Sequence, residues 1–286
     1  MSDQANLATS LKQCTTPLSL LTFLSSTLSA DNASLRPFST FTPAIYDTTW
    51  LSMVHRASAD GDGKIEWLFP SCWTYILDTQ LEDGSWPSYA APIDGILNTL
   101  ASLLALFTRQ KNGSSQLDVA PPLAERVADA TRGLQRLLDV WDIDSTVHVG
   151  FEMLVPRLLH QLSSIYNVKL SFATQPKLDA LYAKKIKKFR PEIVYADIST
   201  TLIHSLEALV GLLDFDRLRH HCSARNGMLG SPAATAAYLM NVEVWDETAE
   251  EYLKSAVACY GGAVSSAFPT EIFEVSWVSW FKQPIV

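Results

Sequence analysis

The sequence predicts an all-α protein, and two observations support that fold class. Apolar residues recur at helical spacing in nearly every segment, and short turns containing Pro, Gly, Asn or Asp separate the segments. Eleven helices in 286 residues leave little room for a sheet. The pattern places them over residues 17–30, 43–57, 67–80, 94–110, 121–140, 150–166, 177–189, 199–213, 231–241, 246–259 and 270–281.

Two of these helices carry clear start signals. Pro121 and Pro122 open the helix 121–140, where a missing N–H costs nothing because the first turn has no intrahelical acceptor for it. Asp246 followed by Glu247 suits the first turn of the helix 246–259, since a carboxylate caps the free N–H groups there.

A weak internal repeat predicts how the helices are arranged. Glycine turns occur at 83–86, 226–229 and 261–264, and the first two are soon followed by a proline. Many Ala and Ser residues let helices approach closely, which suits a toroid of inner and outer antiparallel helices. An irregular helical bundle is the alternative that the repeat leaves open.

The segment from Gln80 to Trp86, with sequence Gln-Leu-Glu-Asp-Gly-Ser-Trp, predicts a capped corner between two helices. Gly84 can adopt the positive φ of a tight turn, and Asp83 can accept hydrogen bonds from the local backbone. Trp86 can cover the helix end as a packing anchor. We therefore interpret these four residues as structural.

Composition limits the classes of partner. The net charge of −8 gives no general attraction to nucleic acid or to an anionic membrane. Four widely spaced cysteines form no CxxC pair and indicate free thiols of a reducing compartment.

No apolar run reaches the ~18–20 residues of a membrane span, and the segment 17–30 is better interpreted as an amphipathic helix than as a signal peptide. The sequence thus predicts a cytoplasmic protein.

One basic cluster stands out against this acidic background. Five basic residues crowd into seven positions, namely Lys184, Lys185, Lys187, Lys188 and Arg190. Such a cluster can hold a diphosphate, and a solvated helix face is the alternative.

Seven short motifs follow one another over residues 40–280. They lie at Tyr46–Trp50, Trp67–Pro70, Gln80–Trp86, Leu202–Glu207, Leu213–Leu218, Ser231–Leu239 and Phe268–Trp277. Each alone is weak, but in this order they resemble the motifs of fungal diterpene synthases of the copalyl diphosphate synthase and kaurene synthase type.

The resemblance implies a domain organisation built from helical toroids. Residues 1–60 would supply the first helices of a β domain, 61–265 a γ-type α-helical domain, and 266–286 the truncated start of the returning β domain. In this family the class II active site lies between the two domains.

The resemblance also implies an activity, which these residues alone do not complete. Family members protonate the terminal alkene of geranylgeranyl diphosphate with an Asp of a DxDD motif, use Mg²⁺, and cyclise to a copalyl-type diphosphate. Here Asp60-x-Asp62, Asp142-x-Asp144 and Asp214-x-Asp216 are not followed by another Asp, and no two Asp are adjacent, so DDxxD is missing too. We expect a truncated, catalytically incomplete form. The alternative is a non-catalytic domain that pairs with a separate C-terminal cyclase chain.

By the same resemblance, His204 matches a γ-domain histidine that helps to deprotonate the cyclised cation, and Ser266 occupies the place of its Asn partner. A histidine bonded to a carbonyl is the alternative interpretation. Lys185 matches a lysine that binds the diphosphate, a role that Lys187 or Lys188 could fill instead.

Three acidic residues, Asp142, Asp144 and Glu152, fall where plant relatives carry an acidic motif linked to Mg²⁺, for which oxygen ligands are suited. A solvated acidic loop is the alternative. Asp47 and Trp50, one helical turn apart, are expected to brace the domain interface.

A helical-toroid glycosidase is a third class of protein to consider. It would use paired carboxylates such as Glu152, Glu207 and Asp214. The order of the seven motifs argues against it.

Overall fold

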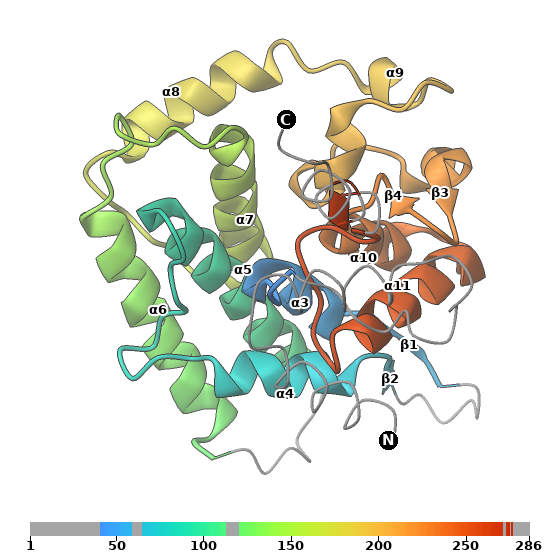
Figure 1. Ribbon diagram of the computed structural model, residues 1–286. Helices are drawn as coiled ribbons and strands as arrows, with labels where there is room; N and C mark the ends of the chain where they lie inside the picture. Colours follow the sequence, from blue (N-terminus) through green and yellow to red (C-terminus); the bar gives the residue numbers. More distant parts are fainter. Residues whose placement is uncertain (1–40, 59–64, 113–119, 271–272, 275, 277–286) are drawn as a thin grey trace, which may run out of the picture.

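The computed structural model describes residues 41–58, 65–112, 120–270, 273–274 and 276 (Figure 1). These residues are predominantly helical, which confirms the predicted fold class. The helices are α3 (Ile45–Ser52), α4 (Pro70–Asp78), α5 (Pro92–Lys111), α6 (Leu123–Asp139), α7 (Phe151–Tyr166), α8 (Gln175–Ile186), α9 (Pro191–Val194), α10 (Pro232–Asn241) and α11 (Glu247–Cys259), with 3₁₀ helices η2 (Thr201–Leu209) and η3 (Phe215–His221).

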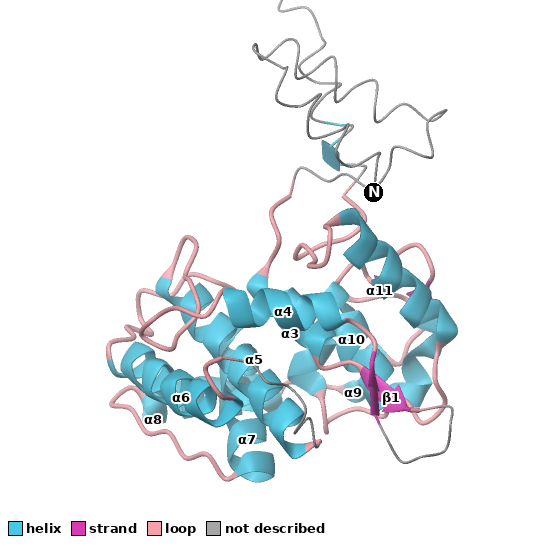
Figure 2. Ribbon diagram, turned by 90° about the horizontal axis from the view of Figure 1, so that it is seen from below, coloured by secondary structure: helices cyan, strands magenta, loops and turns pink. Residues whose placement is uncertain are grey.

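Helix α3 lies at the centre of the described residues (Figure 1). It packs against α4, α5 and α10, and every residue of it except Tyr46 is buried. Helix α6 packs along α5, and α7 links α5 to α8 and to η2 (Figures 1 and 2). The apolar side chains of these helices form one continuous core, and α3 lies within it. The predicted domain boundary at residue 60 stays a prediction.

Two short antiparallel hairpins accompany the helices. Strand β1 (His55–Ala57) pairs with β2 (Ile65–Trp67), and β3 (Cys222–Ser223) pairs with β4 (Gly227–Met228). The predicted helix 43–57 is therefore wrong at its end, because α3 stops at Ser52 and the chain turns into β1. Strands of two or three residues are too short to display the two-residue alternation by which a strand is recognised.

The predicted helix 199–213 is also corrected. It is a 3₁₀ helix over Thr201–Leu209, and the backbone at Ser205 leaves the helical region with φ −139° and ψ 45°. The predicted helix 17–30 and most of 270–281 lie outside the described residues.

The corner formed by Gln80–Trp86 packs against α6. Gly84 has a φ of 86°, and a Cβ added there would lie 2.2 Å from the carbonyl oxygen of Asp129. The side chain of Gln80 donates to the carbonyl of Gly84 over 3.1 Å. Trp86 is 1% exposed, and its Nε1–H donates to the Ile76 carbonyl over 3.0 Å.

Asp83 completes the corner. Its Oδ1 accepts hydrogen bonds from the backbone N–H of Ser85 at 2.9 Å and from the Ser85 hydroxyl at 2.6 Å. These bonds, together with the nearby charge of Arg136, hold the pKa of Asp83 below its ordinary value although partial burial opposes them. The charged turn is thus fixed to α6 by Arg136, in addition to the close approach of Gly84 to the Asp129 backbone.

Two further predictions concern the chain as a whole. Cys72 and Cys222 are free thiols, and Cys14 lies outside the described residues. Among the helices in the described ranges, none is both long enough and apolar enough to span a lipid bilayer.

Candidate active site

His204 is an exposed residue of η2 whose ring is oriented by the backbone. Its Nδ1 lies 3.1 Å from the carbonyl oxygen of Leu229. A carbonyl only accepts hydrogen bonds, so we assign the proton of the neutral ring to Nδ1. The Nε2 atom then carries the lone pair. An imidazole in this tautomer can accept a proton at Nε2 from a group that approaches the surface.

The turn that binds His204 also binds the segment that contains Ser266. Leu229 has a φ of 51°, which is unusual for a residue with a side chain. The carbonyl of the next residue, Gly230, accepts a hydrogen bond of 2.9 Å from the N–H of Phe268. Ser266 lies exposed two residues earlier, and no hydrogen bond between its side chain and His204 is found in the described part of the chain.

Two buried carboxyl groups, of Asp47 and Glu207, contact elements next to this arrangement or belong to them. Asp47 is 6% exposed, and its Oδ1 accepts a hydrogen bond of 3.3 Å from the N–H of Ala233, in the first turn of α10. Glu207 is 3% exposed, and its Oε1 accepts one of 3.4 Å from the hydroxyl of Tyr46. The other oxygen, Oε2, is buried without a partner in the described structure.

Burial dominates the protonation of both groups. Loss of solvation raises the pKa of Asp47 to about 7, against the opposing hydrogen bond from Ala233. It raises the pKa of Glu207 to about 8, with a further contribution from the charge of Asp47. These carboxyl groups bind protons more tightly than an exposed Asp or Glu. The sequence motif around His204 did not reveal this, because burial depends on the packing of α3 against η2 and α10.

Asp47 and Trp50 both lie inside the described fold. Trp50 is 3% exposed, and its ring meets Tyr46 edge-on at a centroid distance of 6.5 Å. Their expected role at a domain interface stays a prediction.

The structure brings Glu152 and Lys185 together. The Lys185 Nζ atom lies 2.6 Å from Glu152 Oε1, while Glu152 Oε2 accepts a hydrogen bond of 3.1 Å from the N–H of Gly150. Burial alone would raise the pKa of Glu152, but the bond and charge of Lys185 and the Gly150 N–H outweigh it, so the pKa is lowered.

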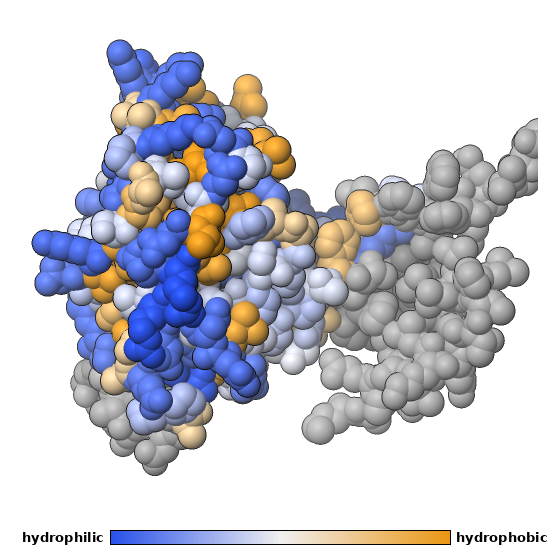
Figure 3. All heavy atoms as spheres, turned by 90° about the vertical axis from the view of Figure 1, so that its left-hand side faces the viewer, coloured by the Kyte–Doolittle hydropathy of each residue, from blue (hydrophilic) through white to orange (hydrophobic). Residues whose placement is uncertain are grey.

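The lysines of α8 and its C-terminal end are exposed. The face of the molecule drawn in Figure 3 carries many hydrophilic residues with scattered hydrophobic ones. Lys185 stays 53% exposed despite its ion pair. Lys187 caps the helix, and Lys188 follows it. Both side chains are exposed, and no ion pair of either residue is found within the described ranges.

The acidic residues of the predicted magnesium site are engaged with other groups. Asp142 Oδ1 accepts a hydrogen bond of 3.0 Å from the N–H of Asp144, whose own carboxylate pairs with Lys177 of α8. Glu152 is paired with Lys185. Within the described ranges no three acidic, His or Cys side chains gather closely enough to hold a metal ion. In this arrangement Asp142, Asp144 and Glu152 do not fit a metal site together.

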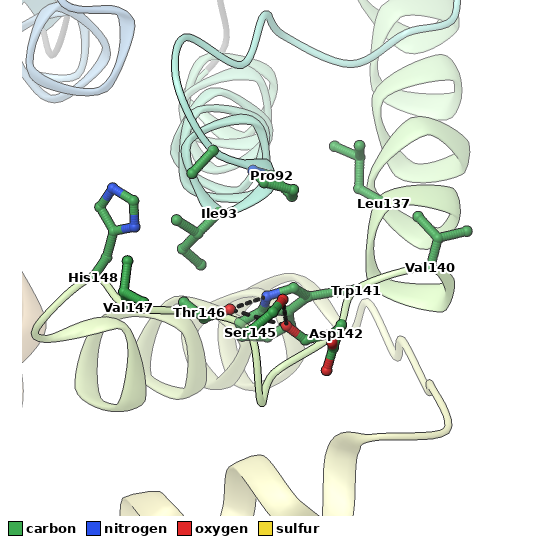
Figure 4. A pocket seen from close by; sticks show the side chains of 11 residues that line it. Pro92, Ile93, Leu137, Val140, Trp141, Asp142, Ser145, Thr146, Val147 and His148 are labelled. Carbon is green, nitrogen blue, oxygen red and sulfur yellow. Dashed lines mark hydrogen bonds between the residues drawn. The ribbon is translucent and has the colours of Figure 1, made fainter.

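A small cavity opens between the start of α5, the end of α6 and the loop that follows it (Figure 4). Its volume is about 190 Å³. Indole Nε1 of Trp141 donates to the Thr146 hydroxyl over 2.9 Å and so fixes this loop. His148 lies at the rim of the cavity, and its Nε2 atom is 3.8 Å from Oδ1 of Asp94. The cavity is lined by Ala91, Pro92, Ile93, Leu137, Val140, Trp141, Asp142, Ser145, Thr146, Val147 and His148.

Sequence reasoning missed this cavity because its lining comes from elements that are far apart in the chain. Among the lining residues only Asp142 is a predicted site residue, and the prediction for it is a magnesium ligand. The apolar lining suits a hydrocarbon group better than a diphosphate.

Comparison with known proteins places the fold in a class. The structure superposes on abietadiene synthase from Abies grandis with a TM-score of 0.70 and 25% identity, covering 97% of this chain and 33% of that one. It superposes on ent-copalyl diphosphate synthase from Arabidopsis thaliana, solved with (S)-15-aza-14,15-dihydrogeranylgeranyl thiolodiphosphate, with a TM-score of 0.65 and 29% identity, covering 89% of this chain and 35% of that one. The fold is therefore that of terpene cyclases.

The sequence comparisons identify the family within this class. Pimaradiene synthase from Emericella nidulans is 44% identical over 242 residues, which are 82% of this chain and 24% of that protein. Copalyl diphosphate synthase from Talaromyces verruculosus is 41% identical over 85% of this chain and 25% of that protein. Ent-kaur-16-ene synthase from Fusarium fujikuroi is 39% identical over 82% of this chain and 25% of that protein. No family model matches the chain.

The chain belongs to the family of fungal diterpene synthases. It spans about a quarter of the length of the curated relatives that it matches.

Proposed function

We propose that this chain forms the base-bearing side of a class II diterpene cyclase site that acts on geranylgeranyl diphosphate. The observation that carries the proposal is the geometry of His204, whose Nδ1 is held by the Leu229 carbonyl so that Nε2 can accept a proton. The family supports the substrate class, since a structurally similar cyclase was solved with an analogue of this diphosphate.

The reaction assigned to this side of the site is a proton transfer. After a carboxylic acid has protonated the terminal alkene and the rings have closed, the cation carries one positive charge next to a C–H bond. His204 Nε2 takes that proton, directly or through one water, and the C–H electron pair becomes the new C=C bond. The ring becomes an imidazolium, and the diphosphate is kept.

The acid of this reaction is not among these 286 residues by motif, because none of the Asp-x-Asp segments extends to DxDD. We propose that it is supplied by sequence corresponding to the part of the relatives that the chain does not span. The site would then be shared between this chain and that part.

The exposed lysines suit the other end of the substrate. Lys187 and Lys188 are available for the diphosphate, and Lys185 would join them on release from Glu152. Magnesium, which the resemblance implies, stays a prediction. We do not assign it to Asp142, Asp144 and Glu152, because Asp144 and Glu152 are paired with lysines.

The test is complementation. The chain is mixed with a separately expressed remainder of the Talaromyces copalyl diphosphate synthase, and the products formed from geranylgeranyl diphosphate are identified by mass spectrometry after dephosphorylation. We expect a copalyl-type product with both parts and none with either alone. His204→Ala should lower turnover by about 10²–10⁴-fold, the usual contribution of a general base. Absence of product from the two folded, associated parts would refute the proposal.

The second candidate is a non-catalytic domain that pairs with a separate cyclase chain. The exposed apolar residues Leu202 and Leu229, which are 38% and 43% exposed, favour a contact near His204. The same assay separates the two functions. Full turnover with His204→Ala would leave only the scaffolding role.

A further inference from the structure

We propose that Tyr46 and Asp47, two neighbouring residues of α3, are positioning residues that hold His204 and its carbonyl partner in register. Tyr46 holds the helix that carries His204, and Asp47 holds the helix that follows the Leu229 turn. The effect of these two residues on catalysis rests on the proposed function. The contacts themselves, and the measurement of the His204 tautomer that tests them, do not depend on it.

The first contact fixes η2. The Tyr46 hydroxyl donates to Glu207 Oε1 over 3.4 Å, and Glu207 lies three residues after His204. Between them the backbone at Ser205 leaves helical values. Because the helix is interrupted there, regular backbone hydrogen bonding does not by itself fix the direction of His204. Glu207 is 3% exposed, so this anchor lies in the interior.

The second contact fixes the turn. Asp47 Oδ1 accepts the hydrogen bond from Ala233 N–H in the first turn of α10, where Ser231 also caps the helix by accepting from Ala234 N–H at 3.1 Å. Leu229 lies just before this helix start and has a φ of 51°. A side-chain-bearing residue in that region is unfavourable unless its surroundings hold it there.

Both contacts come from one buried helix at the centre of the fold (Figure 1). The hydrogen bond from His204 Nδ1 to the Leu229 carbonyl lies between these two contacts. It is exposed to water, so by itself it stabilises the orientation of the His204 ring only modestly. If either side shifts, the ring loses its acceptor and the proton can move to Nε2. In that tautomer Nε2 cannot serve as a base.

The test is ¹⁵N NMR of the histidine tautomers in the 286-residue chain, at a pH where the ring is neutral. Wild type should show His204 with the proton on Nδ1. Tyr46→Phe and Asp47→Ala should shift the tautomer ratio toward Nε2–H by about fivefold, the equivalent of one hydrogen bond. Asp47→Asn should restore the wild-type ratio because its amide oxygen still accepts from Ala233 N–H.

Tyr238→Phe is the matched control. It removes a buried hydrogen bond of 2.7 Å from Tyr238 of α10 to Asp246, and neither of these residues belongs to α3. The inference is overturned if folded Tyr46→Phe leaves the ratio unchanged, or if Tyr238→Phe changes it equally. Tyr46→Phe removes one oxygen only, so it tests the inference even if Asp47→Ala fails to fold. If the tautomers respond as expected but His204→Ala keeps full turnover in the complementation assay, the proposed function fails and the positioning role stands.

Discussion

The guanidinium carbon of Arg109 lies 3.7 Å from the centroid of the Trp67 ring. A second ring, that of Trp73, lies 4.7 Å from the same carbon, so the cation is held between two aromatic faces. Arg109 is 3% exposed and donates to the carbonyl of Ser52 at 2.8 Å, at the point where α3 ends. The arginine thus joins the end of α3 to β2 and α4, and no ion pair between it and a carboxylate is found within the described residues.

Arg109→Lys should destabilise the protein by about 1–3 kcal/mol. Lysine keeps the charge but loses the planar group that stacks on both rings, and its ammonium is harder to desolvate. Urea unfolding measures the change. Arg132→Lys is the control, because Arg132 is 66% exposed and should alter stability by less than about 0.5 kcal/mol. Equal stability of the two variants would contradict the stacking role.

Gly84→Ala should be among the most damaging small substitutions. An alanine at position 84 would have to keep a φ of 86°, which strains the backbone of a residue with a side chain. Its Cβ would also lie 2.2 Å from the Asp129 carbonyl oxygen, which is a steric overlap. We expect a loss of roughly 3 kcal/mol or more in urea unfolding.

Gly261→Ala isolates the strain. Its φ is 66°, but nothing lies within 4 Å of the added Cβ, so only about 1 kcal/mol should be lost. If both alanine variants lose the same amount, the close approach of the corner to α6 contributes nothing.

The same corner shows how far the sequence alone could be interpreted. Its glycine turn and its tryptophan follow from residue type, because few residues tolerate a positive φ and few side chains cover a helix end so well. That Gly84 approaches α6 at Asp129 does not follow, since it depends on how α6 packs. Local signals predicted most helices for the same reason, and failed at β1 and η2, where tertiary contacts decide the backbone.

The candidate site divides in the same way. His204 was found through its motif, and its resemblance to a known base supplied a role. The contact of Glu207 with Tyr46 and that of Asp47 with Ala233 were not predictable, because the two residues of each pair are 161 and 186 positions apart in the sequence. The ion pair of Glu152 with Lys185 joins residues that had been assigned to different ligands.

Glu207→Gln should change how stability depends on pH. The folded-state pKa of Glu207, about 8, lies above the value of 4.5 expected for the unfolded chain, because burial favours the neutral acid. Its contribution is fully present below pH 4.5 and is lost as pH rises toward 8. Gln has no such proton to lose.

The stability of Glu207→Gln relative to wild type should therefore increase by roughly 2–4 kcal/mol between pH 5 and pH 8. Urea unfolding at both pH values measures this. Asp47 and Tyr46 face Glu207, and Asp47 titrates in part of the same range with a pKa of about 7, so Asp47→Asn is measured alongside. A pH-independent difference between wild type and Glu207→Gln would show that Glu207 is ionised in the folded protein throughout.

Glu152→Gln should strengthen the binding of inorganic pyrophosphate to the chain. In the wild type the Lys185 ammonium lies 2.6 Å from the Glu152 carboxylate, which competes with any anion for the same charge. An ion pair with one exposed partner contributes up to about 1 kcal/mol, so its removal should raise affinity by about threefold to fivefold. Isothermal titration calorimetry at fixed ionic strength measures this.

Asp144→Asn is the matched control, because it frees Lys177 at another point of α8 and should leave pyrophosphate affinity unchanged. Adding Lys185→Ala to Glu152→Gln should remove the gain. If the double variant binds as tightly as Glu152→Gln alone, Lys185 does not hold the diphosphate, and Lys187 and Lys188 become the residues to substitute next.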